Sequence, residues 1–123
     1  MIKLTTDISI KQGVTLNRDI REYVERRPKV MCKGLNGRPV FLTKYLVTTK
    51  GRLDKNRRRQ RFFAGLDLLR KIRWEDTTDQ IQEPLGNASF EFKGITPKGE
   101  TVGVHVREET EGKNRRLYLI STF

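Results

Sequence analysis

The only histidine of the chain, His105, lies in a segment whose residue types could carry acid–base chemistry. Apolar and polar residues alternate along "TVGVHVREE" (101–109), which predicts a β-strand with its three valines toward a core. His105 and Arg107 would then share the opposite face. Histidine titrates near neutral pH and can take or give a proton, and arginine holds a phosphate group through two parallel hydrogen bonds.

The last strand, predicted in "RRLYLISTF" (115–123), would add polar groups to that face. Its leucines, Leu117 and Leu119, match the valines of the neighbouring strand. The residues predicted beside the histidine are Arg116, Tyr118 and Thr122. Ser121 falls on the side of the leucines unless a β-bulge re-aims it, so both hydroxyls stay candidates.

A third strand is predicted in "ASFEFKGI" (88–95), with Phe90 and Phe92 toward the core and Glu91 and Lys93 on the polar face. This face matches the needs of metal-free RNA cleavage. Those needs are a base for the 2′-hydroxyl proton, an acid for the leaving 5′-oxygen and a cation for the phosphoryl charge. The alternative is that the face is simply solvated, as one side of an antiparallel sheet often is.

Two helices are predicted before these strands. The segment "LNRDIREYVERRP" (16–28) fits a helix that is capped by Asn17 and ended by its proline. The segment "LDKNRRRQRFFAGLDLLRKIRW" (53–74) fits a longer helix, capped by Asp54 or Asn56. Its apolar stripe consists of Phe62, Leu66, Leu69 and Ile72.

The remaining N-terminal segments are less clearly patterned. Asn36-Gly37 predicts a hairpin turn within residues 29–49. The spacing of apolar residues in the same segment also fits a helix. We favour the hairpin. The residues with that helical spacing are Phe41, Leu42, Tyr45 and Leu46. Residues 2–10 fit a short edge strand. The whole pattern predicts one α+β domain over residues 1–123, with N-terminal helices packed on a C-terminal antiparallel sheet of three to four strands.

The chain carries a net charge of +11, from 26 basic and 15 acidic residues. A field of this size favours a polyanionic partner, which could be nucleic acid, an anionic membrane or an acidic protein. Arginines in the first turns of the second helix lie near the positive end of the helix dipole, which is unfavourable for cations. Their presence there indicates contacts with phosphate groups rather than with solvent alone. The residues predicted to bind RNA are Arg57, Arg58, Arg59, Arg61 and Lys93.

The chain has too few cysteines and histidines for a disulfide bond or a Cys/His metal site. A single cysteine, Cys32, excludes an internal disulfide, and no Cys/His ligand set exists, so we expect no metal and no cofactor. No apolar run approaches the roughly 20 residues of a membrane-spanning helix, and the first residues lack the apolar region of a secretory signal. We expect action in the cytoplasm, and we leave open delivery from another cell as the C-terminal part of a larger protein.

The segment "FKGITPKGETVGVHVREETEGKNRRLYLISTF" (92–123) resembles the end of the barnase–EndoU–colicin–RelE group of ribonucleases, in particular its phage-associated and polymorphic-toxin branches. The strand–turn–strand pattern with "YLIST" on the last strand carries the likeness. The resemblance implies helices before a four-stranded antiparallel sheet, RNA cleavage without metal, often of tRNA, and a paired immunity protein or antitoxin. The catalytic residues that it implies are His105, Arg107, Arg116, Tyr118, and Ser121 or Thr122.

Several branches of this group use two histidines, and this chain has only one. The second proton carrier would then be Glu91, Glu109, Tyr118 or a lysine, or the reaction would use none. We expect a metal-independent endoribonuclease toxin that leaves 2′,3′-cyclic phosphate ends and is neutralised by an acidic immunity protein or antitoxin. The alternatives are a non-enzymatic basic nucleic-acid-binding protein, such as a phage regulator, and a basic protein-interaction module.

Overall fold

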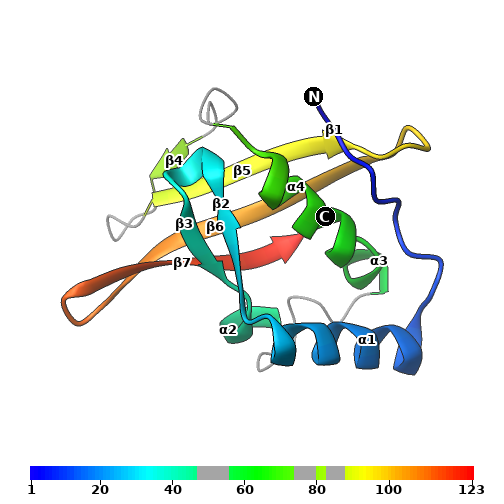
Figure 1. The fold of residues 1–123 in the computed structure, drawn as a ribbon, viewed down its shortest axis with the longest axis horizontal. Helices are drawn as coiled ribbons and strands as arrows, with labels where there is room; N and C mark the ends of the chain where they lie inside the picture. The colour runs from blue at the N-terminus through cyan, green and yellow to red at the C-terminus, as the bar shows by residue number, and fades with distance from the viewer. Residues whose placement is uncertain (47–55, 74–79, 83–87) are drawn as a thin grey trace.

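The computed structural model describes residues 1–46, 56–73, 80–82 and 88–123, and the fold is α+β (Figure 1). The helices are α1 (Gly13–Arg26), the 3-10 turn η1 (Lys33–Leu35), α2 (Thr43–Leu46), α3 (Asn56–Gln60) and α4 (Phe62–Lys71). The strands are β1 (Ile2–Lys3), β2 (Lys29–Cys32), β3 (Arg38–Phe41), β4 (Gln80–Gln82), β5 (Ala88–Ile95), β6 (Thr101–Glu111) and β7 (Asn114–Thr122). None of the helices in the described ranges is both long and apolar enough to cross a lipid bilayer.

The sheet is larger than the predicted sheet of three to four antiparallel strands, and it is mixed. Its strands follow the order β1-β5-β6-β7-β3-β2, and the short β4 pairs with β5 beside this path. The central β5, β6 and β7 are antiparallel as predicted, but β1 joins β5 and β3 joins β7 in parallel. The antiparallel sheet prediction was therefore wrong at both edges, where segments from the N-terminal third complete the sheet.

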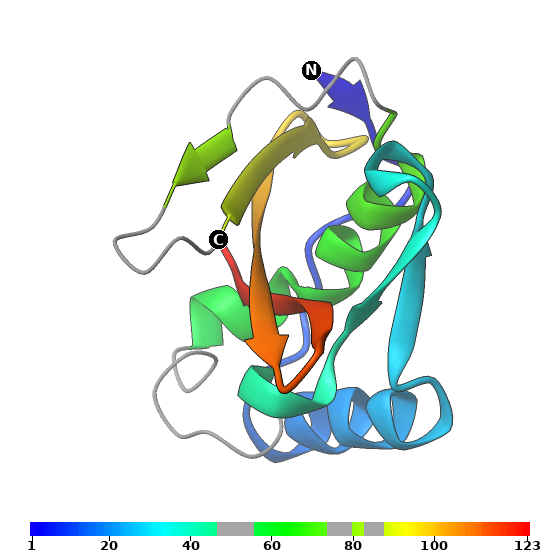
Figure 2. The ribbon, with the colours of Figure 1, turned by 90° about the vertical axis from the view of Figure 1, so that its left-hand side faces the viewer.

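The sheet curls around α4, which lies between β5–β6 on one side and β2–β3 on the other (Figure 2). The inner face carries the valines of β6 and the two leucines of β7, all almost completely buried. Gly65 lets α4 come close, because a Cβ atom there would lie 2.7 Å from Cγ2 of Thr122. The predicted inward direction of the valines and leucines is confirmed, so the polar residues that alternate with them occupy the outer face.

The first helix begins earlier than predicted. It starts at Gly13, so Asn17 is an internal residue and not a cap; its side-chain oxygen accepts a hydrogen bond from Arg59 at 2.8 Å. The extra turn buries Leu16 in line with Ile20 and Val24. The predicted end is confirmed, because the last helical residue is Arg26, before the proline.

The second predicted helix is divided at Arg61 into α3 and α4. The carbonyl of Arg58 accepts hydrogen bonds from the hydroxyl of Thr122 at 2.7 Å and from the N–H of Arg61 at 3.1 Å, so it is not used in a regular helical bond. The predicted apolar stripe of α4 is confirmed and fully buried. The possible cap Asp54 lies outside the described residues, whereas Asn56 is the first residue of α3.

The predicted hairpin in residues 29–49 is confirmed and consists of β2 and β3. Asn36 and Gly37 both have positive φ, at 60° and 67°, which is the conformation that this residue pair adopts readily in a tight turn. The helical spacing that also fitted this segment corresponds only to the single turn of α2. Because β3 pairs with β7, this hairpin brings α2 onto β7 and hence onto the outer face.

Candidate functional site

Three polar side chains form a row across the middle of the outer face. In the register of the sheet, His105 of β6 lies between Glu91 of β5 and Ser121 of β7. Directly paired residues of antiparallel strands have Cβ atoms about 4.5–5.5 Å apart, so their side chains can interact. Glu91 and His105 are half-buried and Ser121 is largely buried. The predicted grouping of Glu91 with the histidine is confirmed.

A β-bulge decides which hydroxyl belongs to this row. The register shifts between His105 and Val106, so Ile120 is an additional residue in β7. Ser121 consequently lies opposite His105, and Thr122 lies opposite Val104 on the inner face. Thr122 is fully buried. The prediction that Thr122 points to the histidine was wrong, because an extra residue reverses every later side chain in a strand.

The next row along the sheet carries Arg107 and an aromatic pair. Arg107 lies between Ser89 of β5 and Tyr118 of β7, and Tyr118 pairs in turn with Phe41 of β3. The rings of Phe41 and Tyr118 lie 6.0 Å apart. Arg107 and Tyr118 therefore share the face of the histidine, as predicted, whereas no local pattern indicated that Phe41 extends this row.

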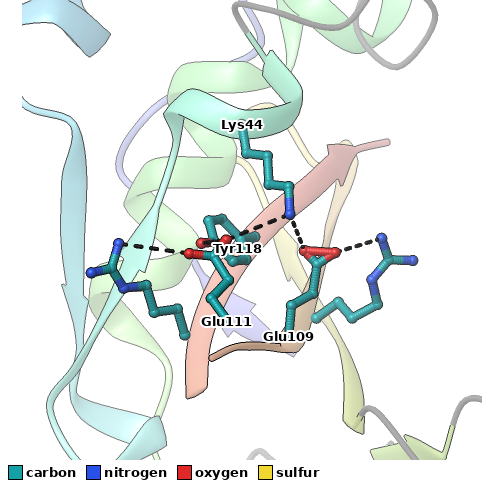
Figure 3. Close-up of polar contacts among 6 residues, drawn as sticks. Lys44, Glu109, Glu111 and Tyr118 are labelled. Carbon is teal, nitrogen blue, oxygen red and sulfur yellow. Dashed lines mark hydrogen bonds and ion pairs between the residues drawn. The ribbon is translucent and has the colours of Figure 1, made fainter. Parts of the chain in front are cut away.

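A network of ion pairs holds the end of this face (Figure 3). Lys44 of α2 lies 3.1 Å from a carboxylate oxygen of Glu109 and 3.6 Å from one of Glu111, and its Nζ lies 4.9 Å from the ring centre of Tyr118. Glu109 also accepts a hydrogen bond from Arg107 at 3.2 Å. Sequence reasoning missed Lys44, because only the parallel pairing of β3 with β7 brings α2 to this place.

The electrostatics of the network keep Tyr118 in its phenol form. Burial raises the pKa of Tyr118, and its hydrogen bond to the Glu111 carboxylate raises the pKa further. The same hydrogen bond is the main cause that lowers the pKa of Glu111, with help from Lys44 and Arg116. Tyr118 is therefore a hydrogen-bond donor at neutral pH and a poor base.

Arg116 lies at the edge of the face rather than beside the histidine. It pairs with Glu109 in the register, its guanidinium lies 4.0 Å from Glu111, and it covers the ring of Phe41 at 5.2 Å from the ring centre. Arg116 and Arg107 lie on the same face of the sheet, as predicted. Its contacts point toward β3, away from the row of His105.

The arginines of α3 lie against the carboxyl end of β7, since the Arg58 carbonyl accepts the bond from Thr122. Arg57 is exposed, and Arg61 donates to the Arg57 carbonyl at 2.9 Å. Burial lowers the pKa of Arg61, and the nearby positive charge of Arg57 lowers it further. Lys93 is exposed on β5, opposite Gly103 and next to the row of the histidine. The closeness of Arg57 and Arg61 favours a bound anion.

Metal ligands do not gather in the described part of the chain, where no group of three or more histidine, cysteine or acidic side chains is arranged to hold an ion. Cys32 is fully buried in the core, and burial raises the pKa of its thiol, so it stays protonated and packs as a small apolar side chain.

No protein-family model matches this chain, and neither a curated protein nor a solved structure is detectably similar to it.

Proposed function

We propose that the protein is a metal-independent endoribonuclease whose active site is the outer face of β5, β6 and β7. The observation that carries the proposal is the row of Glu91, His105 and Ser121 across three paired strands. A rigid sheet holds a carboxylate, an imidazole and a hydroxyl side by side, and Arg107 follows in the next row. Together they supply the two proton carriers and the cation that cleavage of a ribose phosphate needs.

In the proposed reaction, the Glu91 carboxylate takes the proton of the ribose 2′-hydroxyl. The 2′-oxygen attacks the phosphorus atom, and the bond to the 5′-oxygen breaks. Protonated His105 gives its proton to that leaving oxygen, so the products are a 2′,3′-cyclic phosphate and a free 5′-hydroxyl. Glu91 is the better second carrier, because Glu109 is engaged with Lys44 and Arg107, and Tyr118 with Glu111.

Arg107 stabilises the charge that develops on the phosphoryl group, and Glu109 positions its guanidinium. Ser121 donates a hydrogen bond to the substrate, whereas Thr122 has a structural role. Arg116 acts at the edge of the site together with Tyr118. The cations of α3 and Lys93 contact the backbone of the RNA, with tRNA or another structured RNA as the substrate.

The biological proposal is a toxin that acts in the cytoplasm and is neutralised by an acidic immunity protein or antitoxin. The net charge of +11 supports both partners, because RNA and an acidic protein are each attracted by the same field. Binding of RNA without cleavage is the competing function.

The deciding experiment is cleavage of total tRNA in excess EDTA by the wild type, His105→Ala and Glu91→Gln. Glu25→Gln, an exposed carboxylate on α1, is the matched control. We expect discrete fragments with 2′,3′-cyclic ends from the wild type and the control. Each site variant should be slower by roughly a hundredfold or more, which is the usual contribution of a general acid or base.

Equal cleavage by His105→Ala and the wild type would remove the centre of the proposal. Intact RNA in every sample, together with salt-sensitive RNA binding, would instead identify a nucleic-acid-binding protein that does no chemistry.

A further inference from the structure

A basic groove lies beside the proposed active site, between β3 and the hairpin of β6 and β7. Its volume is about 440 Å³. Four cations and one aromatic ring form most of its lining, namely Arg38, Lys113, Arg115, Arg116 and Phe41. None of these residues was predicted to contact RNA except Arg116, which was placed with the catalytic residues.

We propose that this groove binds a single-stranded stretch of RNA next to the cleaved bond, with a base stacked on the guanidinium of Arg116, which Phe41 supports, and phosphates on the cations of the hairpin. The inference rests on the proposed ribonuclease function and extends it from one phosphate to a longer substrate.

A row of neighbouring residues on paired strands links the groove to the proposed active site. Arg107 pairs with Tyr118, Tyr118 pairs with Phe41, and the two rings lie 6.0 Å apart. The guanidinium of Arg116 lies over Phe41 at 5.2 Å from the ring centre. A base that enters the groove therefore meets a guanidinium plane supported by an aromatic ring, which is the kind of surface on which unpaired RNA bases stack.

The charge of the groove also fits a polyanion. Glu108 lies within ion-pair distance of Arg38 and Arg115, and Glu111 lies 4.0 Å from Arg116. The groove therefore has four cations and two neighbouring carboxylates. In the part of the chain that the structure describes, no carboxylate forms an ion pair with Lys113. The side chain of Arg115 is 69% exposed, so it can reach a phosphate in solution.

The test compares a dinucleotide with an octanucleotide of single-stranded RNA as substrates. Only the octanucleotide is long enough to occupy both the active site and the groove. The groove variants are Lys113→Ala/Arg115→Ala and Phe41→Leu. The control is Arg18→Ala/Arg21→Ala, which removes two exposed arginines from α1 and changes the net charge equally.

For the groove variants we expect kcat/KM to fall at least tenfold more for the octanucleotide than for the dinucleotide. We expect the control to affect both substrates alike. With a non-cleavable 2′-O-methyl octanucleotide, the double groove variant should reduce the salt slope of binding by roughly 1.4, since each lost phosphate contact on a single strand accounts for about 0.7.

Equal effects on the two substrates, or an unchanged salt slope, would overturn the groove proposal even if His105→Ala abolishes cleavage. Failure of the wild type to cleave total tRNA in a parallel assay would instead overturn the proposed function. The 2′-O-methyl binding measurement still decides, in that case, whether the groove holds RNA.

Discussion

At the scale of single residues, one additional residue in β7 places the hydroxyls of Ser121 and Thr122 on opposite faces of the sheet. Because of the bulge at Ile120, Ser121 faces His105, while Thr122 donates a partly buried hydrogen bond to the Arg58 carbonyl at 2.7 Å. We expect Ser121→Ala to lower kcat for RNA cleavage roughly 10–100-fold, because a donor to the reacting phosphate is lost. Its free energy of unfolding should change little.

Thr122→Val is the paired variant, and the opposite result is expected. Loss of the hydroxyl should lower the free energy of unfolding by about 1 kcal/mol, while kcat of the folded enzyme stays near the wild-type value. Urea unfolding and RNA cleavage measured on both variants test this division. Loss of activity in Thr122→Val with unchanged activity in Ser121→Ala would contradict the bulge as the device that aims the site.

At the scale of elements, Asp67 ties the segment after β1 to α4. Its carboxylate accepts hydrogen bonds from the backbone N–H groups of Thr5 at 2.8 Å and Thr6 at 3.2 Å, and it lies 3.0 Å from the ammonium of Lys71. Burial by itself would raise the pKa of Asp67, but these donors outweigh burial and lower the pKa below its usual value.

A carboxyl with a lowered pKa in the folded state stabilises the fold at pH values above its unfolded pKa, near 3.9. This stabilisation is lost as the pH falls through the lower folded pKa. We expect Asp67→Asn to reduce the free energy of unfolding by about 1–3 kcal/mol at pH 7 and to remove part of the wild-type loss in acid. Urea unfolding at pH 7 and pH 3 measures both effects.

Asp19→Asn is the control for Asp67→Asn, because Asp19 of α1 forms a surface ion pair with Lys11 at 3.0 Å. Surface pairs contribute little to stability. An equal effect of the two variants at pH 7 would contradict the role of Asp67 as the anchor of the N-terminal segment.

At the scale of the whole molecule, the excess of positive charge should dominate association with RNA. If about five phosphates are contacted, the logarithm of the binding constant should fall with the logarithm of salt concentration with a slope of roughly −3.5 for a single strand. Fluorescence anisotropy with a 2′-O-methyl oligonucleotide at several salt concentrations measures this slope. A slope near zero would exclude phosphate contacts as the main source of affinity.

Much of the local structure follows from the sequence alone. The bounds of β5, and those of β6 and β7 to within two residues, follow from the alternation of apolar and polar residues, as does the inner position of the valines of β6 and the leucines of β7, because side chains of a strand point to opposite faces. The apolar stripe of α4 and the Asn36-Gly37 turn are equally local signals. Hence the grouping of Glu91, His105, Arg107 and Tyr118 on one face could be predicted without coordinates.

Only the tertiary structure decided the edges of the sheet, the bulge and the position of Lys44. The strands β1 and β3 are two and four residues long. Local signals indicated an edge strand and a hairpin there, but not the parallel pairing of β1 with β5 and of β3 with β7, which are far away in the sequence. The bulge moved Thr122 to the core and Ser121 to the site, because register depends on packing across strands. Local pattern determines which way a side chain points, whereas its neighbours depend on contacts between distant segments.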